Sequence, residues 1–257
     1  MLHDLADRLR AGQTLIGTWL YLNDVGVAEI VAGVGFDFMM IDMEHSPTGF
    51  DNLRSLLMAI EHHCAPMVRV KANSPEFISA ILDLGPAGIM VPRVNTAEQA
   101  RLAVKNAKFH PLGLRGFGPY RVSDYTRNLA EVLSRANDKQ MLWIQIEHRD
   151  AVSNIEQITE VEGIDALFVG MGDLSQSLGH LGGMAHPETL EKIRRVVDVA
   201  RRCGLPIGSA FGTDTNLCEW HKAGMRIFTV AADFRFVVNG AHKALARAKA
   251  ALGLRNA

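Results

Sequence analysis

Two acidic residues, Glu147 and Asp173, each follow a short apolar stretch with the composition of a buried strand. Glu147 comes directly after Met141–Ile146, and Asp173 follows Ala166–Val169 after a turn that contains two glycines. If these strands are parallel neighbours, they lie about 5 Å apart, and their end residues can share one ion. Carboxylate oxygens are the ligands that hard divalent cations prefer. The pair therefore predicts a divalent-metal site and the place where this chain does its chemistry.

Arg69 and Gln145 lie in strand-like stretches whose ends would face the same site. Side chains alternate along a strand, so Gln145 shares a face with Glu147. Arg69 could simply neutralise carboxylates at the mouth of the sheet. However, its guanidinium group could also bind a substrate carboxylate at two points. The second interpretation suits an arginine that faces a cation site.

His45 follows another strand-like stretch, which ends in the sequence Asp42-Met43-Glu44-His45. Asp42 and Glu44 share a face for the same reason of alternation, and the following turn places His45. Alone, His45 would be a capping residue before Pro47. Beside two acids and an arginine, a base that titrates near neutral pH is the better interpretation.

The remaining histidines suggest no metal site. None of the ten histidines shows the HxH or HExxH spacing of zinc-binding sequences. His180 and His186 fall in a loop with no obvious partner. The sequence therefore argues against a histidine-rich zinc site.

Eight short apolar stretches, separated by segments of helical periodicity, must position these residues. The stretches are 15–22, 36–42, 66–70, 89–94, 141–146, 166–169, 206–210 and 226–231. Strands that alternate with helices indicate a parallel sheet, and eight such units close a barrel. The alternative is an open doubly wound sheet, but no GxGxxG motif follows the first strand. We predict an α/β fold that is a single (β/α)8 TIM barrel over residues 1–257, with its active site at the carboxyl ends of the strands.

The segment between the fourth and fifth predicted strands, residues 95–140, is longer than the other segments between strands. After a helix over 96–108 comes the segment 109–125, which is rich in glycine, arginine and aromatic residues. Loops of this length in a compact domain are usually functional or disordered. We expect this segment to be an ordered active-site loop. The alternative is a surface loop that contacts no ligand.

The composition and net charge of the chain argue against several classes of function. The 257 residues are 48% hydrophobic and carry a net charge of −1, which argues against a nucleic-acid or anionic-membrane partner. The three cysteines lack CxxC spacing and are typical of reduced thiols in a cytoplasmic protein. No signal peptide and no apolar stretch of ~18 residues is present, so we expect no membrane span.

Nine segments along nearly the whole chain resemble the HpcH/HpaI family of class II pyruvate aldolases, whose type member is a 4-hydroxy-2-oxoheptanedioate aldolase. They are 33–37, 41–45, 68–69, 82–85, 91–92, 145–147, 170–174, 177–179 and 186–187. The resemblance implies a barrel of the phosphoenolpyruvate/pyruvate type. It also implies a homohexamer that exchanges a C-terminal helix, here residues 241–252.

The resemblance also implies a role for each matching residue. Glu147 and Asp173 would bind the metal, Mg²⁺ or Mn²⁺ with Co²⁺ also accepted, and Arg69 would bind the pyruvyl group and stabilise its enolate. His45 would be the acid/base residue, supported by Asp42 and Asp83. The substrate-binding residues would be Arg69, Gln145, Gly170, Met171, Gly172 and Asp173. Met171 replaces the usual proline of the family.

The sequence thus predicts a metal-dependent aldolase that reversibly cleaves a 4-hydroxy-2-oxoacid to pyruvate and an aldehyde. The segment 116–121 differs from the best-known aldolases, so the aldehyde is not determined. One alternative is a citramalyl- or malyl-CoA-type lyase, which would need a basic groove for the CoA phosphates. A second is a non-catalytic metabolite-binding barrel, against which the intact metal, arginine and histidine positions argue.

Overall fold

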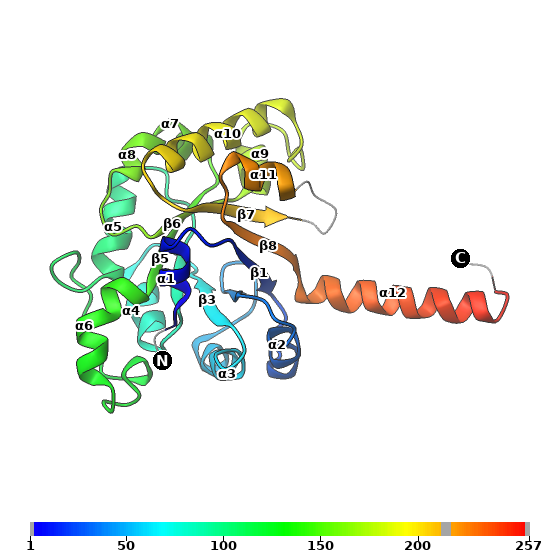
Figure 1. Cartoon of the computed structure of the whole chain (residues 1–257), viewed down its shortest axis with the longest axis horizontal. Coiled ribbons are helices and arrows are strands. Elements are labelled where there is room, and N and C mark those ends of the chain that lie inside the picture. The colour runs from blue at the N-terminus through cyan, green and yellow to red at the C-terminus, as the bar shows by residue number, and fades with distance from the viewer. Residues whose placement is uncertain (1–2, 212–216, 255–257) are drawn as a thin grey trace.

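Eight parallel strands close into a barrel in the computed structural model, which describes residues 3–211 and 217–254 (Figure 1). The strands are β1 (Leu15–Leu20), β2 (Phe38–Asp42), β3 (Ala65–Arg69), β4 (Gly88–Val91), β5 (Met141–Ile146), β6 (Ala166–Val169), β7 (Ile207–Phe211) and β8 (Ile227–Ala232). Each strand pairs with the next, and β8 pairs with β1. The predicted barrel is therefore confirmed, and the open sheet is excluded.

The helices, most of which follow a strand, surround the barrel, except that the last helix extends away from it (Figure 1). They are α1 (Leu5–Arg10), α2 (Val25–Ala32), α3 (Phe50–Ile60), α4 (Pro75–Asp83), α5 (Ala97–Ala107), the 3-10 helix η1 (Arg121–Ser123), α6 (Leu129–Lys139), α7 (Arg149–Ser153), α8 (Ile155–Thr159), α9 (Met171–Ser177), α10 (Pro187–Arg202), α11 (Leu217–Ala223) and α12 (Asp233–Ala251). Over the described ranges, none of these helices is long and apolar enough to cross a membrane.

Alternation along the strands separates two hydrophobic layers. In β5, Trp143 faces the barrel interior and packs on Phe38 of β2, whereas Leu142 and Ile144 face the surrounding helices. Every residue of β5 is buried, as expected for a strand covered on both faces. Gln145 therefore lies on the interior face, and Glu147 continues that face at the end of the strand.

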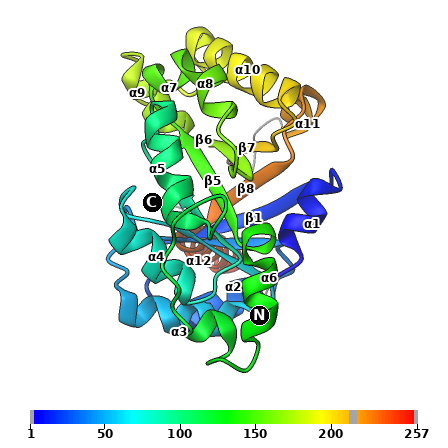
Figure 2. The same cartoon turned by 90° about the vertical axis from the view of Figure 1, so that its left-hand side faces the viewer.

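The segment 109–125 does not lie at the carboxyl ends of the strands, so the expectation of an active-site loop is wrong within a single chain. Because α5 runs back from the carboxyl end of the barrel, the residues that follow it lie at the amino end. Arg121 donates to the carbonyl of Leu84 and to Glu61, which follow α4 and α3. The 3-10 helix η1 contacts both α4 and α6, which lie on the side of the molecule that faces the viewer in Figure 2. Helix α6 itself was not predicted.

Helix α12 extends away from the barrel (Figure 1). It begins at Asp233, eight residues before the predicted 241–252, and its apolar residues Val237 and Leu245 are exposed. On the outer face of the barrel, Ile16 of β1 is 46% exposed. It lines an apolar groove of about 310 Å³ with Phe228 and Val230 of β8. The last helix of the chain therefore leaves part of the barrel wall uncovered.

Candidate active site

Arg69 and Asp42 form a buried ion pair at the carboxyl ends of β3 and β2. They are register partners on neighbouring strands. Arg69 Nε and Nη2 donate to the two Asp42 oxygens at 2.9 and 2.7 Å. Burial opposes the charge of Arg69, but the hydrogen bonds and charge of Asp42 outweigh it, so the pKa of Arg69 is raised. This two-point contact fixes the orientation of the guanidinium group and leaves Nη1 outside it.

Asp42 also orders the turn that carries His45. Its carboxylate accepts hydrogen bonds from the backbone N–H groups of Glu44 at 2.9 Å and His45 at 3.3 Å. The His45 side chain is 51% exposed, and its Nε2 lies 3.8 Å from Glu44 Oε2. A histidine at this position can exchange protons with solvent or with a ligand. The structure thus brings Asp42, Arg69 and His45 together.

Three further residues belong to this site and were not predicted from the sequence. The Arg69 Cζ lies 4.6 Å from the centre of the Trp19 ring, and the charge of Arg69 acts on the hydroxyl group of Tyr21. Burial, opposed by Arg69, raises the pKa of Tyr21 to about 12, so its hydroxyl stays protonated near neutral pH. Trp19 and Tyr21 are two residues apart at the end of β1, and this alternation was the signal that could have identified them. The third residue is Arg93.

Arg93 links Glu147 to Glu44, whose Oε2 lies 3.4 Å from Arg69 Nη1. Its backbone N–H donates to Glu147 Oε1 at 2.8 Å, and its Nε lies 3.1 Å from Glu44 Oε1. The φ angle of Arg93 is +58°, a conformation that costs a residue other than glycine about 1–3 kcal/mol and that gathers at functional sites. No local sequence pattern predicts this angle, because it depends on Glu147, which lies 54 residues further along the chain.

The start of α9 fits closely against Glu147. A Cβ atom at Gly170 would lie 2.8 Å from Glu147 Oε2 and 2.9 Å from Gln145 Nε2, so only glycine fits here. Met171 and Gly172 then open α9, whose first backbone N–H groups have no partner within the helix. Asp173 is exposed in this first turn. The predicted substrate-binding backbone and the predicted metal ligands therefore meet at one edge of the barrel.

Glu147 lies in a cavity of about 390 Å³. The residues that line it are Arg93, Asn95, Glu147, His148, Asp173, Gln176 and Ser177. Burial raises the pKa of Glu147 to about 7. The hydrogen bond from Arg93 and the charge of Arg69 oppose this shift, and the charges of Glu44 and Asp173 add to it. Glu147, Glu44 and Asp173 therefore form a concentration of negative charge, which Arg69 and Arg93 offset in part.

These oxygen atoms fit a hard divalent cation. Glu147 and Asp173 supply carboxylates to one cavity, and a positive ion would relieve the repulsion between them, which adds to the effect of burial on the pKa of Glu147. The buried Gln145 Oε1 has no hydrogen-bond partner, and Glu44 Oε2 has none besides its 3.4 Å ion pair with Arg69 Nη1. Unpartnered buried acceptors are rare, and a cation is one of the groups that satisfies them. All of these donors are oxygen atoms, which is the ligand chemistry of Mg²⁺ and Mn²⁺.

The raised pKa of Glu147 predicts a pH-dependent stability of the metal-free protein. The folded chain holds this proton up to about pH 7, whereas the unfolded value is 4.5. Folding therefore binds a proton between these values, and the free energy of unfolding should fall by about 3 kcal/mol as pH rises from 4.5 to 7. Urea unfolding of metal-free wild type and Glu147→Gln at pH 4.5 and 7.5 measures this. Equal pH dependence in the two proteins would contradict the shift.

Asp83 does not reach His45. It is the last residue of α4, which ends beside the start of β4 at the amino end of the barrel, whereas His45 follows the carboxyl end of β2. Its carboxylate accepts a 2.6 Å hydrogen bond from Arg115 Nη2. Between these two described residues there is no hydrogen bond or ion pair. The prediction that Asp83 supports His45 is therefore wrong within one chain. It stays a prediction for two chains of an assembly.

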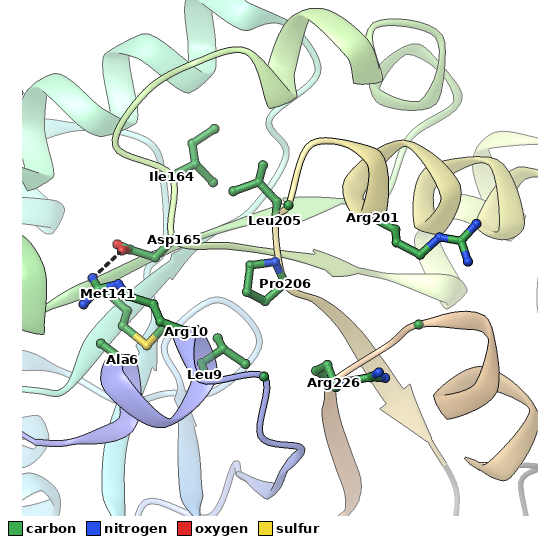
Figure 3. Close-up of a pocket in the computed structure, with 13 residues that line it drawn as sticks. Ala6, Leu9, Arg10, Met141, Ile164, Asp165, Arg201, Leu205, Pro206 and Arg226 are labelled. Atoms are coloured by element: carbon green, nitrogen blue, oxygen red, sulfur yellow. Dashed lines mark hydrogen bonds and ion pairs between the residues drawn. The ribbon is translucent and has the colours of Figure 1, made fainter.

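A second cavity, of about 460 Å³, lies at the amino end of the barrel and is shown in Figure 3. Side chains from α1 and from the segments that lead into β5, β6, β7 and β8 line it. Its one acidic residue, Asp165, accepts a 2.6 Å hydrogen bond from the buried Lys108. Within the described ranges, its lining includes none of the predicted catalytic residues. The cavity beside Glu147 is therefore the candidate active site.

Comparisons with known proteins find matches that cover nearly the whole chain. The family described as HpcH/HpaI aldolase/citrate lyase matches residues 15–240. The chain is 38% identical over 235 residues to a 2-dehydro-3,6-dideoxy-6-sulfogluconate aldolase of Pseudomonas putida, covering 91% of this chain and 92% of that protein. It is 36% identical over 244 residues to a 4-hydroxy-2-oxo-heptane-1,7-dioate aldolase of Klebsiella pneumoniae, covering 94% and 92%.

A solved structure shows the same fold. It is the crystal structure of an HpcH/HpaI aldolase/citrate lyase family protein from Burkholderia cenocepacia J2315. The TM-score is 0.91 at 33% sequence identity, and the match covers 96% of this chain and 99% of that one. The likeness therefore extends over the whole barrel that carries the site.

Proposed function

Because the chain belongs to the HpcH/HpaI aldolase/citrate lyase family, we propose that it reversibly cleaves a 4-hydroxy-2-oxoacid into pyruvate and an aldehyde. Family membership makes it a carbon–carbon lyase, an aldolase that cleaves 2-oxo-acid aldols. The observation that carries the finer proposal is the shared cavity of Glu147 and Asp173, beside an arginine that Asp42 holds in place.

Glu147 and Asp173 would hold a divalent metal, Mg²⁺ or Mn²⁺ with Co²⁺ as a substitute. When bound, the metal supplies Lewis-acid chemistry to the 2-oxo and carboxylate oxygens of the substrate. Gln145 and the first backbone N–H groups of α9, at Met171 and Gly172, would bind the substrate carboxylate. Helix N-termini of this kind attract anions. The missing Cβ of Gly170 leaves room for this contact.

His45 would take the proton of the 4-hydroxyl group. The bond between carbons 3 and 4 then breaks, carbon 4 leaves as the aldehyde carbonyl, and the electron pair stays on carbon 3 as the pyruvate enolate. Arg69 would stabilise the negative charge as it develops on this enolate. Asp42 fixes the guanidinium group and the turn of His45 together, so one carboxylate positions both groups.

A pyruvate-release assay tests this proposal. The purified chain is supplied with Mg²⁺ and a panel of 4-hydroxy-2-oxoacids, and the reverse reaction is run with pyruvate and a panel of aldehydes, with each product identified by mass. We expect pyruvate release and at least one aldol product. No turnover with any member of either panel would favour the non-catalytic barrel. Turnover with citramalyl- or malyl-CoA alone would favour the CoA-type lyase.

Arg69→Lys should lower turnover by about 100-fold or more. Lysine keeps the positive charge but cannot make the two-point contact with Asp42, and loss of one oxyanion donor costs about 100- to 1000-fold. The measurement is kcat and KM for pyruvate release. A raised KM with normal kcat would instead mean that Arg69 only binds the ground state.

Arg8→Lys is the matched control for this substitution. Arg8 lies in α1 at the opposite end of the barrel, and its Nη2 pairs with Asp37 at 2.5 Å. Both substitutions replace an arginine of an ion pair by lysine, so both should lower stability. Only Arg69→Lys should lower kcat, and an equal loss in both variants would assign the effect to stability alone.

We also propose that α12 of one chain packs on the uncovered wall of another in a homohexamer. The exposed apolar residues of α12 and the apolar groove beside Ile16 and Phe228 support this arrangement. The mass of the assembly in solution, compared with that of a chain ending before α12, measures it. The expectations of a cytoplasmic location and of no nucleic-acid or membrane partner stay predictions.

A further inference from the structure

We propose that His180, His186 and Glu188 form a second metal site, which binds a zinc-type divalent cation on the loop between α9 and α10. The three side chains offer ligand atoms that all lie within 4.8 Å of one another. They are separate from Glu147 and Asp173, and nothing in the proposed aldol cleavage uses them. The five residues between the histidines differ from the HxH and HExxH spacings, which is why the sequence argued against such a site.

Gly183 brings the two histidines together. Its N–H donates to the His180 carbonyl at 2.6 Å, and its own carbonyl accepts from the His186 N–H at 2.9 Å. A Cβ atom at Gly183 would lie 2.8 Å from the His180 carbonyl oxygen and 3.0 Å from the His180 Cβ. Its absence lets the two imidazole rings approach to 3.6 Å between centroids. The loop therefore holds the histidines close before any ion binds.

The hydrogen bonds of the three side chains show which of their nitrogen and oxygen atoms can bind a metal. His186 Nδ1 accepts from the Glu188 N–H at the start of α10, so its Nε2 is the nitrogen left for a metal. His180 Nε2 lies 2.8 Å from Glu188 Oε2, with one proton between them. A metal would replace that proton, as it does whenever it binds protonated ligands.

The side chains can adjust to a bound ion. Zinc bonds of about 2.0–2.1 Å place tetrahedral ligands about 3.3 Å apart, so His180 Nε2 and Glu188 Oε2 must separate by a few tenths of an ångström. The stacked rings must also turn so that both nitrogens point at one ion. His186 and Glu188 are exposed, so neither movement disturbs the core.

The ligand types select the metal. Two imidazoles and one carboxylate suit Zn²⁺, Co²⁺ or Ni²⁺, whereas Mg²⁺ and Ca²⁺ prefer oxygen atoms alone. The site beside Glu147 offers oxygen atoms only, so the two sites should take different metals. A metal here would join the loop 178–186 to the first turn of α10. That loop directly follows α9, which carries Asp173.

Calorimetric titration of the full chain tests the site. The protein is stripped with a chelator, excess Mg²⁺ is added to compete at the oxygen site, and Zn²⁺ is titrated into wild type and His180→Gln. Wild type should bind one more Zn²⁺ per chain than the variant. The lost affinity should exceed ~100-fold, since even a supporting hydrogen bond to a metal ligand costs about 10- to 100-fold. With Co²⁺, only wild type should show the visible absorption of a nitrogen-ligated ion.

Two more variants separate this site from adventitious binding. Gly183→Ala keeps all three ligands but moves His180, so it should also lose the extra Zn²⁺, whereas Gly116→Ala, which has open space around it, should not. His62 also lies beside a glutamate, 3.9 Å from Glu61, so His62→Gln is the matched histidine control. Unchanged Zn²⁺ binding in His180→Gln, or equal loss in His62→Gln, would overturn the proposal.

Discussion

Removal of divalent metal should abolish aldol cleavage, and Mg²⁺ or Mn²⁺ should restore it. Glu147 and Asp173 supply the carboxylates of the candidate site, and burial, with added repulsion from Glu44 and Asp173, raises the pKa of Glu147 to about 7. Asp173→Asn removes one anionic ligand from an exposed position, so it should weaken metal binding while the fold is kept. Glu147→Gln should do the same. Metal affinity measured by calorimetry, together with pyruvate release, checks both expectations.

Glu61→Gln is a suitable control for the metal ligands. Glu61 is a partly buried glutamate that pairs with Arg121 at the amino end of the barrel. Its substitution should leave metal affinity unchanged. Full activity in excess chelator would contradict the metal-dependent mechanism. Trapping of a pyruvyl-lysine adduct by borohydride would contradict it as well, because that adduct belongs to Schiff-base aldolases.

His45→Ala should lower the rate of aldol cleavage by about 100- to 10,000-fold, which is the usual contribution of a general base. Metal and pyruvate affinity should stay near wild type, because His45 lies at the exposed rim and is not among the proposed metal ligands. Pyruvate is the suitable ligand for this comparison, since it lacks the 4-hydroxyl group that His45 would deprotonate. Calorimetry with pyruvate and cleavage rates across pH measure the two effects separately.

His62→Ala is the matched control for His45→Ala. Each histidine is exposed and lies beside a glutamate, at 3.8 Å for His45 and 3.9 Å for His62. The control should keep the wild-type rate. Loss of metal or pyruvate binding in His45→Ala would make His45 a ligand or a structural residue. Binding with a normal cleavage rate would place the base elsewhere in the site.

The fold could be predicted because its signals are local. Most of the strands are short apolar runs that end at or just before a glycine or a polar residue, and β5 and β6 begin and end where the sequence predicted. The periodicity of Leu53, Leu56 and Leu57 predicts the buried face of α3, where all three are fully buried. The number of alternating units then determined the closure of the barrel.

Part of the site could be predicted for the same reason. Residues at strand ends meet at one edge of a parallel barrel whatever their distance along the chain. The pairing of Asp42 with Arg69, and the common cavity of Glu147 and Asp173, follow from this rule. The sequence alone therefore determined the strand order and the acids, arginine and histidine at the strand ends.

Contacts between segments that lie far apart in the sequence could be identified only from the tertiary structure, because no local sequence pattern predicts them. The backbone of Arg93 turns to a positive φ to reach Glu147, and the ring of Trp19 lies over Arg69. The prediction that Asp83 lies near His45 was wrong within one chain. Asp83 ends helix α4, which runs antiparallel to the strands, so it lies at the amino end of the barrel, whereas His45 lies at the carboxyl end. His180 and His186 meet only because Gly183 leaves space between them. Spacing along the chain predicts which elements form, whereas the packing of distant segments determines which side chains touch.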